Sequence, residues 1–126
     1  MAANIATIQA LLSFLNGTTG AAANIQLALT SFAVAGNHFV NDVFNVPTTA
    51  GGTAIPKGGV GNGGFFIFLN TDPTNYVQIL NAVGGTVLLR IGPGEPAMGR
   101  FDPTVTAPAA VANSGAVDLA YLFLDA

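Results

Sequence analysis

Glycine and proline interrupt this chain every few residues, and this punctuation limits the length of any regular element it can form. Sixteen glycines and seven prolines occur among its 126 residues. The runs between them are rich in Val, Ile, Phe, Leu and Thr, which favour strands over helices. No segment shows a convincing amphipathic helical period. The sequence therefore predicts an all-β chain of seven to nine short strands.

Several runs carry the strand signal. Residues 5–15 also have helical potential because Ala and Leu favour helices, but the following segments repeat the same texture without helical spacing, so we expect a strand. Residues 25–34 are apolar on both faces, which predicts a strand covered on each side. After the Gly36-Asn37 turn, residues 38–46 are expected to return as its hairpin partner. Asp42 falls on the more apolar parity of this run, which indicates an edge strand or a buried hydrogen bond.

The second half of the chain alternates strands with turns. Residues 48–64 indicate a loop or a weak edge strand, and the continuous apolar run 65–69 predicts a central strand buried on both faces. The next expected strands are 76–80 and 87–91. Turn residues at 72–75, 84–85 and 92–94 flank these strands, and the pattern implies two hairpins. Pro93 and Gly94 suit the central positions of a type II turn. Residues 117–124 form the last expected strand.

This pattern favours one architecture for the whole chain. Short strands with turns at close intervals indicate a single β-sandwich domain over residues 1–126, of jelly-roll or immunoglobulin-like type. The strand pattern does not choose between these two topologies. The length lies within the usual range of one domain.

Charge is scarce along the whole sequence. Nine Asp, Glu, Lys and Arg residues occur, where an average composition of about 25% would give about 31, and none lies within residues 1–41. Surfaces buried in permanent oligomers are similarly apolar and poor in charge, so we expect an obligate assembly subunit. A small secreted or stable cytosolic β domain that is merely low in charge is the alternative.

Composition also bears on the other classes of partner. Three scattered basic residues offer no stripe for phosphates, so no nucleic acid is expected. The charge-free stretch is interrupted by polar residues and has no cationic start, so neither a membrane span nor a signal peptide is expected. The absence of cysteine removes disulfides, thiolate metal ligands and cysteine nucleophiles.

Catalytic chemistry has little basis in the sequence. His38 is the only histidine, and a Ser-His-Asp set could be composed from it with Ser31 or Ser114 and Asp42, but neither serine has the local context of a nucleophile. We interpret His38 as a polar residue at a strand end. The carboxylates form no zinc or calcium ligand pattern. We therefore expect no enzyme, and assign no catalytic, cofactor-binding or metal-binding residue.

Two other clusters have simpler structural explanations. The glycine cluster 58–64 precedes a strand, whereas phosphate-binding glycine loops precede a helix, so we interpret it as a flexible or closely packed loop. Asn70, Asn75 and Tyr76 around Asp72-Pro73 could form a surface recognition patch. A turn whose polar groups satisfy one another is the favoured interpretation.

From about residue 65 onward the order of features resembles small bacteriophage virion proteins with β-sandwich folds. The similar stretches are 64–70, 72–77, Pro93-Gly94-Glu95 with Arg100 downstream, and 117–122. They cover roughly half of the chain, and they are turn and strand signatures. The resemblance implies a virion component, assembled in the host cytoplasm, such as a decoration or cement protein on the head or a minor head or tail protein.

The leading hypothesis is a capsid decoration subunit that bridges capsomers. Its expected partners are further copies of itself, as a trimer or dimer, and the major capsid protein or other virion subunits. The alternative is a small sandwich module that recognises carbohydrate on a host surface. That alternative has a thin supply of aromatic side chains, because the sequence has no Trp and only Tyr76 and Tyr121.

Overall fold

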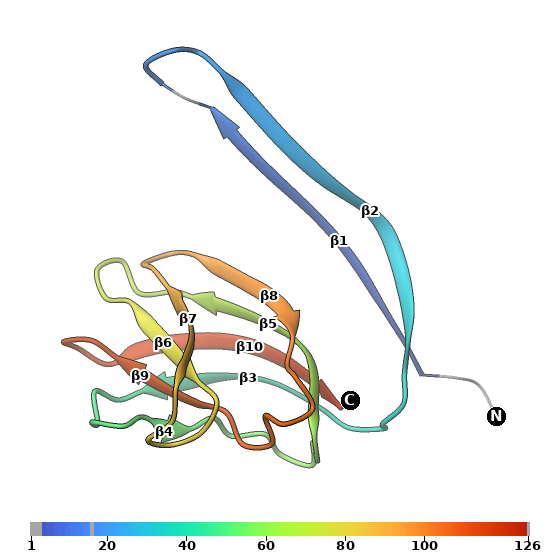
Figure 1. Ribbon diagram of the computed structural model, residues 1–126, viewed down its shortest axis with the longest axis vertical. Helices are drawn as coiled ribbons and strands as arrows, with labels where there is room; N and C mark the ends of the chain where they lie inside the picture. The colour runs from blue at the N-terminus through green and yellow to red at the C-terminus, as the bar shows by residue number, and fades with distance from the viewer. Residues whose placement is uncertain (1–3, 16, 126) are drawn as a thin grey trace. The chain divides into compact units, whose positions relative to one another are not determined.

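The computed structural model describes residues 4–15 and 17–125, and these residues form an all-β structure. They contain ten strands and no helix, arranged in three antiparallel sheets (Figure 1). Contacts divide the chain into two compact units, Met1–Ala35 and Gly36–Ala126. The single domain expected from the sequence spanned both units, whereas each unit has its own sheets.

The first unit is a long hairpin. Strand β1 (Asn4–Leu15) pairs with β2 (Ala22–Val34), with an irregularity between Ile8 and Ala10. The strand predicted over residues 5–15 is confirmed. The predicted pairing of 25–34 with 38–46 is wrong, because β2 pairs with the strand before it. Most described side chains of β2 are exposed, so the expected covering on both faces is also wrong.

The second unit contains two four-stranded sheets. The first has the order β3-β10-β5-β8 and the second the order β4-β9-β6-β7. In the first sheet the strands are β3 (Phe39–Val46), β10 (Val117–Asp125), β5 (Gly63–Asn70) and β8 (Pro96–Arg100). In the second they are β4 (Thr53–Ala54), β9 (Ala109–Ala112), β6 (Val77–Leu80) and β7 (Val87–Ile91).

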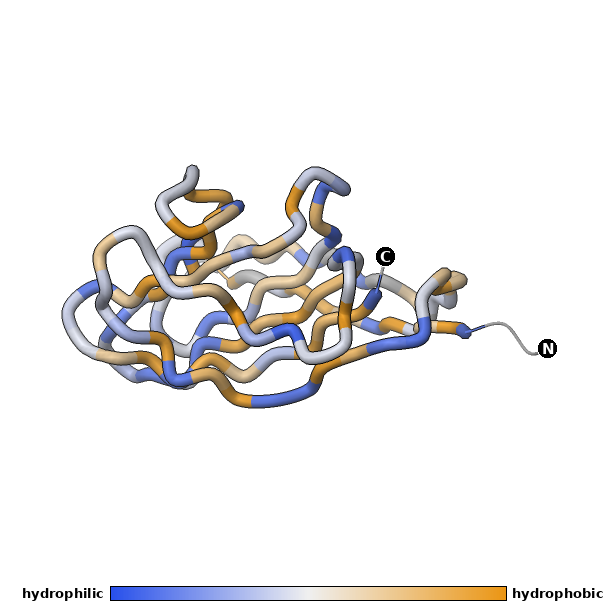
Figure 2. Tube along the Cα trace, turned by 90° about the horizontal axis from the view of Figure 1, so that it is seen from below, coloured by the Kyte–Doolittle hydropathy of each residue, from blue (hydrophilic) through white to orange (hydrophobic). Residues whose placement is uncertain are grey.

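The two four-stranded sheets share one hydrophobic core. Phe66 and Phe68 of β5 and Phe123 of β10 are buried in the same cluster as Val77 and Ile79 of β6. Aromatic rings fill the middle, with the ring centroids of Phe66 and Phe68 4.9 Å apart. Hydrophobic stretches alternate with more polar ones along the strands (Figure 2). Burial alternates along much of β5 and β10, which places one face of each of these strands in the core.

The turns agree with the sequence better than the strand pairing does. Gly94 has a φ of 71°, and the Glu95 amide donates to the Gly92 carbonyl at 3.1 Å, as a type II turn requires. The hairpin of β6 with β7 is confirmed. The hairpin implied across residues 92–94 is wrong, because β8 pairs with β5 in the other sheet. The residues of a turn determine where the chain reverses, but they do not determine which strand the following segment pairs with.

Strand count and burial also differ from expectation. The described residues form ten strands instead of the seven to nine expected, because the short segments 96–100 and 109–112 also pair. The run 65–69 does lie in an interior strand, but only its inner face is fully buried. Ile67 and Leu69 on the outer face are 38% and 42% exposed. Asp42 is exposed on β3, an edge strand, in agreement with the edge interpretation.

Candidate functional site

The two serines and the aspartate of the hypothetical catalytic triad form hydrogen bonds with residues other than His38. The Ser114 hydroxyl donates to Asn75 Oδ1 at 2.9 Å, and the Ser31 hydroxyl pairs with Thr7 Oγ1 at 3.0 Å within the hairpin. Asp42 Oδ1 accepts from the Val43 amide. Each candidate nucleophile thus has a local partner other than His38, and these contacts support the reading of His38 as a strand-end residue.

His38 has an acidic partner that the sequence did not indicate. Its Nδ1 lies 3.0 Å from Asp125 Oδ2, and its backbone amide donates to the same oxygen at 3.1 Å. The Gly61 amide donates to Asp125 Oδ1 at 2.9 Å. Burial alone would raise the pKa of Asp125, but the hydrogen bonds from Gly61 and His38 together lower it. The carboxylate therefore ties the end of β10 to the start of β3 and to the glycine loop.

The glycine loop is closely packed against these strands. Lys57 Nζ donates to the carbonyl oxygens of Gly61 at 2.8 Å and Thr106 at 2.7 Å. A Cβ added at Gly63 would stand only 1.8 Å from an atom of the Phe123 ring. Strand β5 begins at Gly63, so no helix follows the loop. The end of the loop is therefore packed closely at Gly63, and the Gly61 amide and the Lys57 ammonium group donate hydrogen bonds within the protein.

The Asp72 turn is self-satisfied, as its composition predicted. Asp72 Oδ1 accepts from the amides of Thr74 at 2.8 Å and Asn75 at 2.6 Å. The Asn75 amide is the largest cause that lowers the pKa of Asp72, followed by that of Thr74. These bonds hold the carboxylate as part of the turn itself.

Asn70 does not belong to a surface patch, because it is completely buried. Its Nδ2 donates to the carbonyl oxygens of Asn75 at 2.8 Å, Gly92 at 2.9 Å and Ile91 at 3.2 Å. Its Oδ1 accepts from the Asp72 amide at 2.9 Å. Asn70 thus connects the end of β5 to the end of β7 in the other sheet. The signal in the sequence was parity, since position 70 continues the inward set 66 and 68.

A second polar group gathers around Tyr76. The Arg90 guanidinium carbon lies 3.5 Å from the centre of the Tyr76 ring. The Tyr76 amide donates to Asn113 Oδ1 at 3.0 Å, next to the contact between Ser114 and Asn75. The aromatic ring is therefore covered on one face by a cation. Asn75 and Tyr76 make these polar contacts with other groups of the protein.

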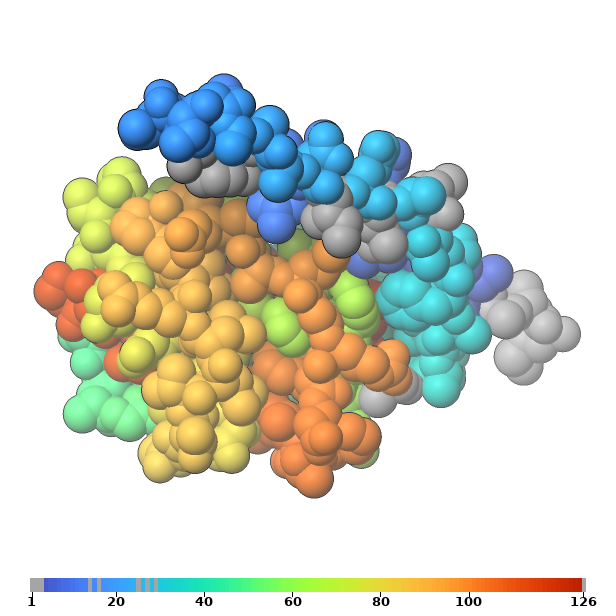
Figure 3. Space-filling view, turned by 45° about the horizontal axis from the view of Figure 1, so that its top comes forward, coloured from blue at the N-terminus to red at the C-terminus, as the bar shows by residue number. Residues whose placement is uncertain are grey.

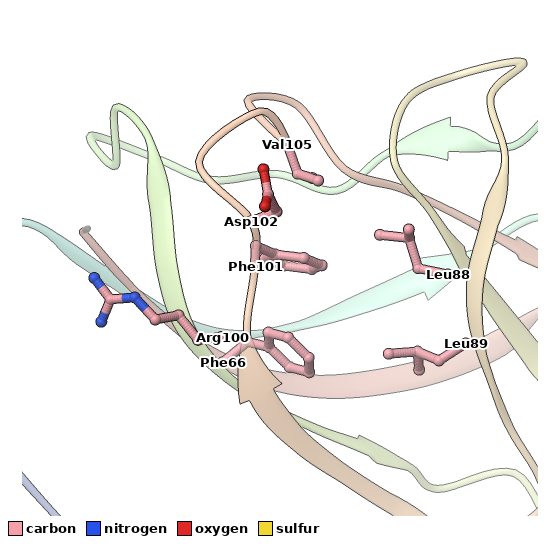
Figure 4. Close-up of a pocket in the computed structure, with 7 residues that line it drawn as sticks. All are labelled: Phe66, Leu88, Leu89, Arg100, Phe101, Asp102 and Val105. Atoms are coloured by element: carbon pink, nitrogen blue, oxygen red, sulfur yellow. The ribbon is translucent and has the colours of Figure 1, made fainter.

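A small cavity opens between β7 and the chain that follows β8. The β7 segment and the segment after β8 lie side by side, with green atoms of the β5 region visible between them (Figure 3). The cavity has a volume of about 200 Å³. It is lined by Phe66, Leu88, Leu89, Arg100, Phe101, Asp102 and Val105 (Figure 4).

The chemistry of this cavity is poor. The Arg100 guanidinium points away from the leucines across the space (Figure 4). The hydroxyl and the amide of Thr104 bond to Asp102 and lower its pKa. Small-molecule sites usually measure about 300–1,000 Å³ and present a few convergent polar groups. This cavity has neither property, so it is a weak candidate for a ligand site.

The outer side of the β3-β10-β5-β8 sheet carries the most extensive feature of the second unit. Cross-strand partners share a face of a sheet, and the pairs Leu124 with Phe39, Leu122 with Ile67, and Ile67 with Met98 all lie on this side. We call this surface the outer apolar face. It consists of Phe39, Val43, Phe65, Ile67, Leu69, Met98, Ala120, Leu122 and Leu124.

Five side chains of the outer apolar face are exposed, on β3, β5 and β8, and the other four, Phe65, Ala120, Leu122 and Leu124, are half-buried. Phe39 is 66% exposed and Val43 57%, and Met98 at the opposite edge is 43% exposed. Strands of five to nine residues, about 4.8 Å apart with a rise of about 3.3 Å per residue, give a footprint of roughly 300–600 Å². Patches of that size on a monomer often mark an interaction site.

Polar side chains on this side of the sheet lie around the apolar surface. The Asn45 amide donates to Asp118 Oδ1 at 2.8 Å across β3 and β10. Asn41 stands opposite Leu122, and Arg100 opposite Phe65 at the edge. An apolar centre with a polar rim is the usual composition of a protein–protein interface.

Known proteins add no identification. No family model matches the chain, and neither a curated protein nor a solved structure matches it with significance. Among the described residues, no group of three or more His, Cys, Asp or Glu side chains is placed to hold a metal ion. The same part of the chain has no helix long and apolar enough to cross a membrane.

Proposed function

We propose that this chain is a non-enzymatic structural subunit of a bacteriophage virion that works by burying apolar surface against its neighbours. The observation that carries the proposal is the outer apolar face, where Phe39, Val43 and Met98 are open to solvent. A sheet that covers a core with one face and leaves the other apolar requires a second layer to bury it. Within this proposal the specific role is a decoration or cement subunit that bridges capsomers.

We further infer that the second unit is a β-sandwich of the jelly-roll type. Of its eight strands β3 to β10, the first, eighth, third and sixth form one sheet and the second, seventh, fourth and fifth form the other. This order supports two interleaved Greek keys, as in viral capsid and lectin domains. An immunoglobulin-like sandwich keeps its first two strands in one sheet, whereas β3 and β4 lie in different sheets here.

The mechanism proposed for such a subunit is added buried area. Each 100 Å² of apolar surface removed from water contributes about 2.5 kcal/mol before the cost of association. With no charged residue in positions 1–41 and an uncharged centre on the outer apolar face, these contacts depend little on ion pairs. Binding should therefore depend little on salt up to about 0.5 M, where charges more than a few ångströms apart are screened.

The experiment is a binding assay with empty phage heads. The purified protein should sediment as an oligomer and bind the matching heads in stoichiometric amounts, with a salt dependence as weak as described above. Mass spectrometry of purified virions should detect the chain. A well-behaved monomer at micromolar concentration that ignores the heads would refute the cement role.

One observation favours a second candidate function, the recognition of host-surface carbohydrate. Tyr76 stacks on Arg90 next to the polar side chains of Asn75, Asn113 and Ser114. Jelly rolls also occur in lectins. Binding of the monomer to a host polysaccharide, lost on Tyr76→Ala, would favour this function over the cement role.

A further inference from the structure

Strand β1 is an edge strand that lacks the features by which edge strands usually avoid pairing. It is one of the two strands of its sheet, and no other described strand pairs with its outer edge. Charged side chains, proline, bulges and shortness are the usual obstacles to pairing at an edge. Residues 4–15 contain no charged residue, proline or glycine, and 12 residues make β1 a long strand. The outer edge of β1 is therefore suited to pair with a further strand.

The other described edge strands each carry at least one such obstacle. In β2 the register shift lies opposite Gln9, where residues 28–29 form a bulge. The edge strand β3 carries the exposed Asp42, and β8 begins with Pro96. Strand β4 has only 2 residues, and β7 has 5, with Arg90 among them. Among the described edges, β1 is thus the one that is regular, long and uncharged.

The sequence of β1 reads similarly in both directions from Ala10. When two copies of a strand pair antiparallel across a two-fold axis at this residue, positions equally far from Ala10 on either side stand opposite each other. Like side chains then meet in three of these pairs: Ile5 with Leu15, Ile8 with Leu12, and Thr7 with Ser13. Gln9 and Leu11 form an unlike pair. A two-fold interface has to be self-complementary in this way.

We propose that β1 pairs antiparallel with β1 of a second copy of this chain, across a two-fold axis at Ala10. The two hairpins then form one four-stranded sheet in the order β2-β1-β1-β2. Pairing of residues 5–15 gives roughly ten to twelve hydrogen bonds between the copies, because an antiparallel ladder makes about one bond per residue pair. A specific interface carries about ten direct hydrogen bonds. The inference rests on the proposed function of a structural subunit and names the strand and register through which two copies associate.

This pairing brings together apolar side chains that are exposed in the single chain. Ile5, Leu11 and Leu15 lie on one face of β1 because side chains alternate along a strand, and they are 65%, 63% and 69% exposed. Ile5 stands directly opposite Leu15 of the second copy, and the two copies of Leu11 are diagonal neighbours within reach of each other. Because residues 1–41 carry no charge, no like charges are placed opposite each other.

Single cysteines test the position of the axis, since the sequence has no cysteine of its own. Ala10 and Ala6 are both half-buried alanines on the same face of β1. Across the axis, the two Cα atoms of residue 10 stand about 4.5–5.5 Å apart, which a disulfide can span. The two copies of residue 6 lie about 26 Å apart. We expect Ala10→Cys to form a disulfide-linked dimer on mild oxidation and the matched control Ala6→Cys to stay largely unlinked.

Two further cysteines test the register. Thr7 and Ser13 are both exposed, and the proposed pairing places each opposite the other. Chains with Thr7→Cys and chains with Ser13→Cys, carrying different tags, are coexpressed and oxidised. We expect a disulfide-linked product that contains both tags. Either variant expressed alone should link much less, because the two copies of the same residue lie about 20 Å apart.

A pair of charge variants measures the effect of this contact on association. The double variant Gln9→Lys with Leu11→Lys places like charges opposite each other across the axis, and Gln9→Glu with Leu11→Lys places opposite charges there. Both positions are exposed. Because like charges across a ladder are destabilising and opposite charges are stabilising, the first variant should have a dissociation constant at least about fourfold higher at low salt. Sedimentation equilibrium measures the constant, and circular dichroism verifies that both variants fold.

The outcomes separate this inference from the proposed function. Equal disulfide yields from Ala10→Cys and Ala6→Cys, or equal dissociation of the two charge variants, would overturn the pairing. A link from Ala10→Cys to a different virion protein would show that a foreign strand occupies the edge, and would overturn it as well. An oligomer that binds phage heads without the link at residue 10 would leave the structural role standing. A linked dimer that ignores the heads would support the pairing and refute the cement role.

Discussion

Replacing Asn70 by aspartate tests whether a buried amide holds the two four-stranded sheets together at one end. The side chain is 0% exposed, and its Nδ2 donates to three carbonyl oxygens at 2.8–3.2 Å. Asn70→Asp keeps the shape but removes both hydrogens and directs a carboxylate oxygen at those carbonyls. The oxygen that accepts from the Asp72 amide is retained.

The expected loss of stability follows from these contacts. Each buried polar group left without its partner costs about 1–3 kcal/mol, so the loss of two donated hydrogens costs about 2–6 kcal/mol, before the burial of a charge is included. We expect a loss of at least about 3 kcal/mol, or roughly 12–24 °C in melting temperature for a domain of this size. The matched control is Asn113→Asp, which keeps the oxygen that accepts from Tyr76 on an exposed side chain.

Denaturation at pH 7 and at acid pH measures the effect. Burial and the facing carbonyls raise the folded-state pKa of the introduced carboxyl above its unfolded value. The penalty is therefore full at neutral pH and is relieved as the pH falls through that raised folded-state pKa. If Asn70→Asp and Asn113→Asp were equally mild at pH 7, the role assigned to the buried amide would be wrong.

Three further predictions concern the turn at Gly94, the packing at Gly63 and the carboxylate of Asp125. Gly94→Val should cost about 1–3 kcal/mol because φ is 71° there. Gly61→Val should be nearly neutral because a Cβ added at Gly61 would meet no atom closer than 3.9 Å. Equal melting temperatures of the two variants would contradict the turn assignment. Gly63→Ala should lower the melting temperature clearly, because its Cβ would overlap the Phe123 ring. The lowered pKa of Asp125 means that its stabilisation is present above about pH 5 and is lost as the pH falls below the ordinary value of 3.8. The stability gap between wild type and Asp125→Asn should therefore close in acid, and a gap independent of pH would argue against a charged carboxylate.

Sequence reasoning captured what is local in this fold. The all-β class, the strand over residues 5–15, the β6–β7 hairpin and the turn at Gly94 all follow from residue type and short spacing. The alternation in residues 117–124 also placed Val117, Leu119, Tyr121 and Phe123 on one face, and that face is buried. These features depend on contacts between near neighbours in the chain.

Long-range pairing could not be derived in the same way. Strand β3 pairs with β10, which lies about 80 residues further along the chain. Turn residues carry no information about a pairing between strands so far apart in the sequence. The sequence predicts burial of Ile67 and Leu69 on the outer face of β5 as well, because the hydrophobicity of a strand does not distinguish a covered face from an exposed one. Likewise, the partner of His38 is Asp125, at the far end of the unit, which no local motif could indicate.

The position of β10 within its sheet bears on when the molecule can begin to associate. Strand β10 is the last described strand to leave the ribosome, yet it lies between β3 and β5 and supplies Ala120, Leu122 and Leu124 to the outer apolar face. Until β10 has emerged, the outer apolar face lacks this interior strand, and β3 lacks its neighbour among the described strands of the sheet. The charge-free residues 1–41 are synthesised before β10, at about 5–20 residues per second. The order of synthesis thus delays the assembly of the outer apolar face until β10 has paired with β3 and β5.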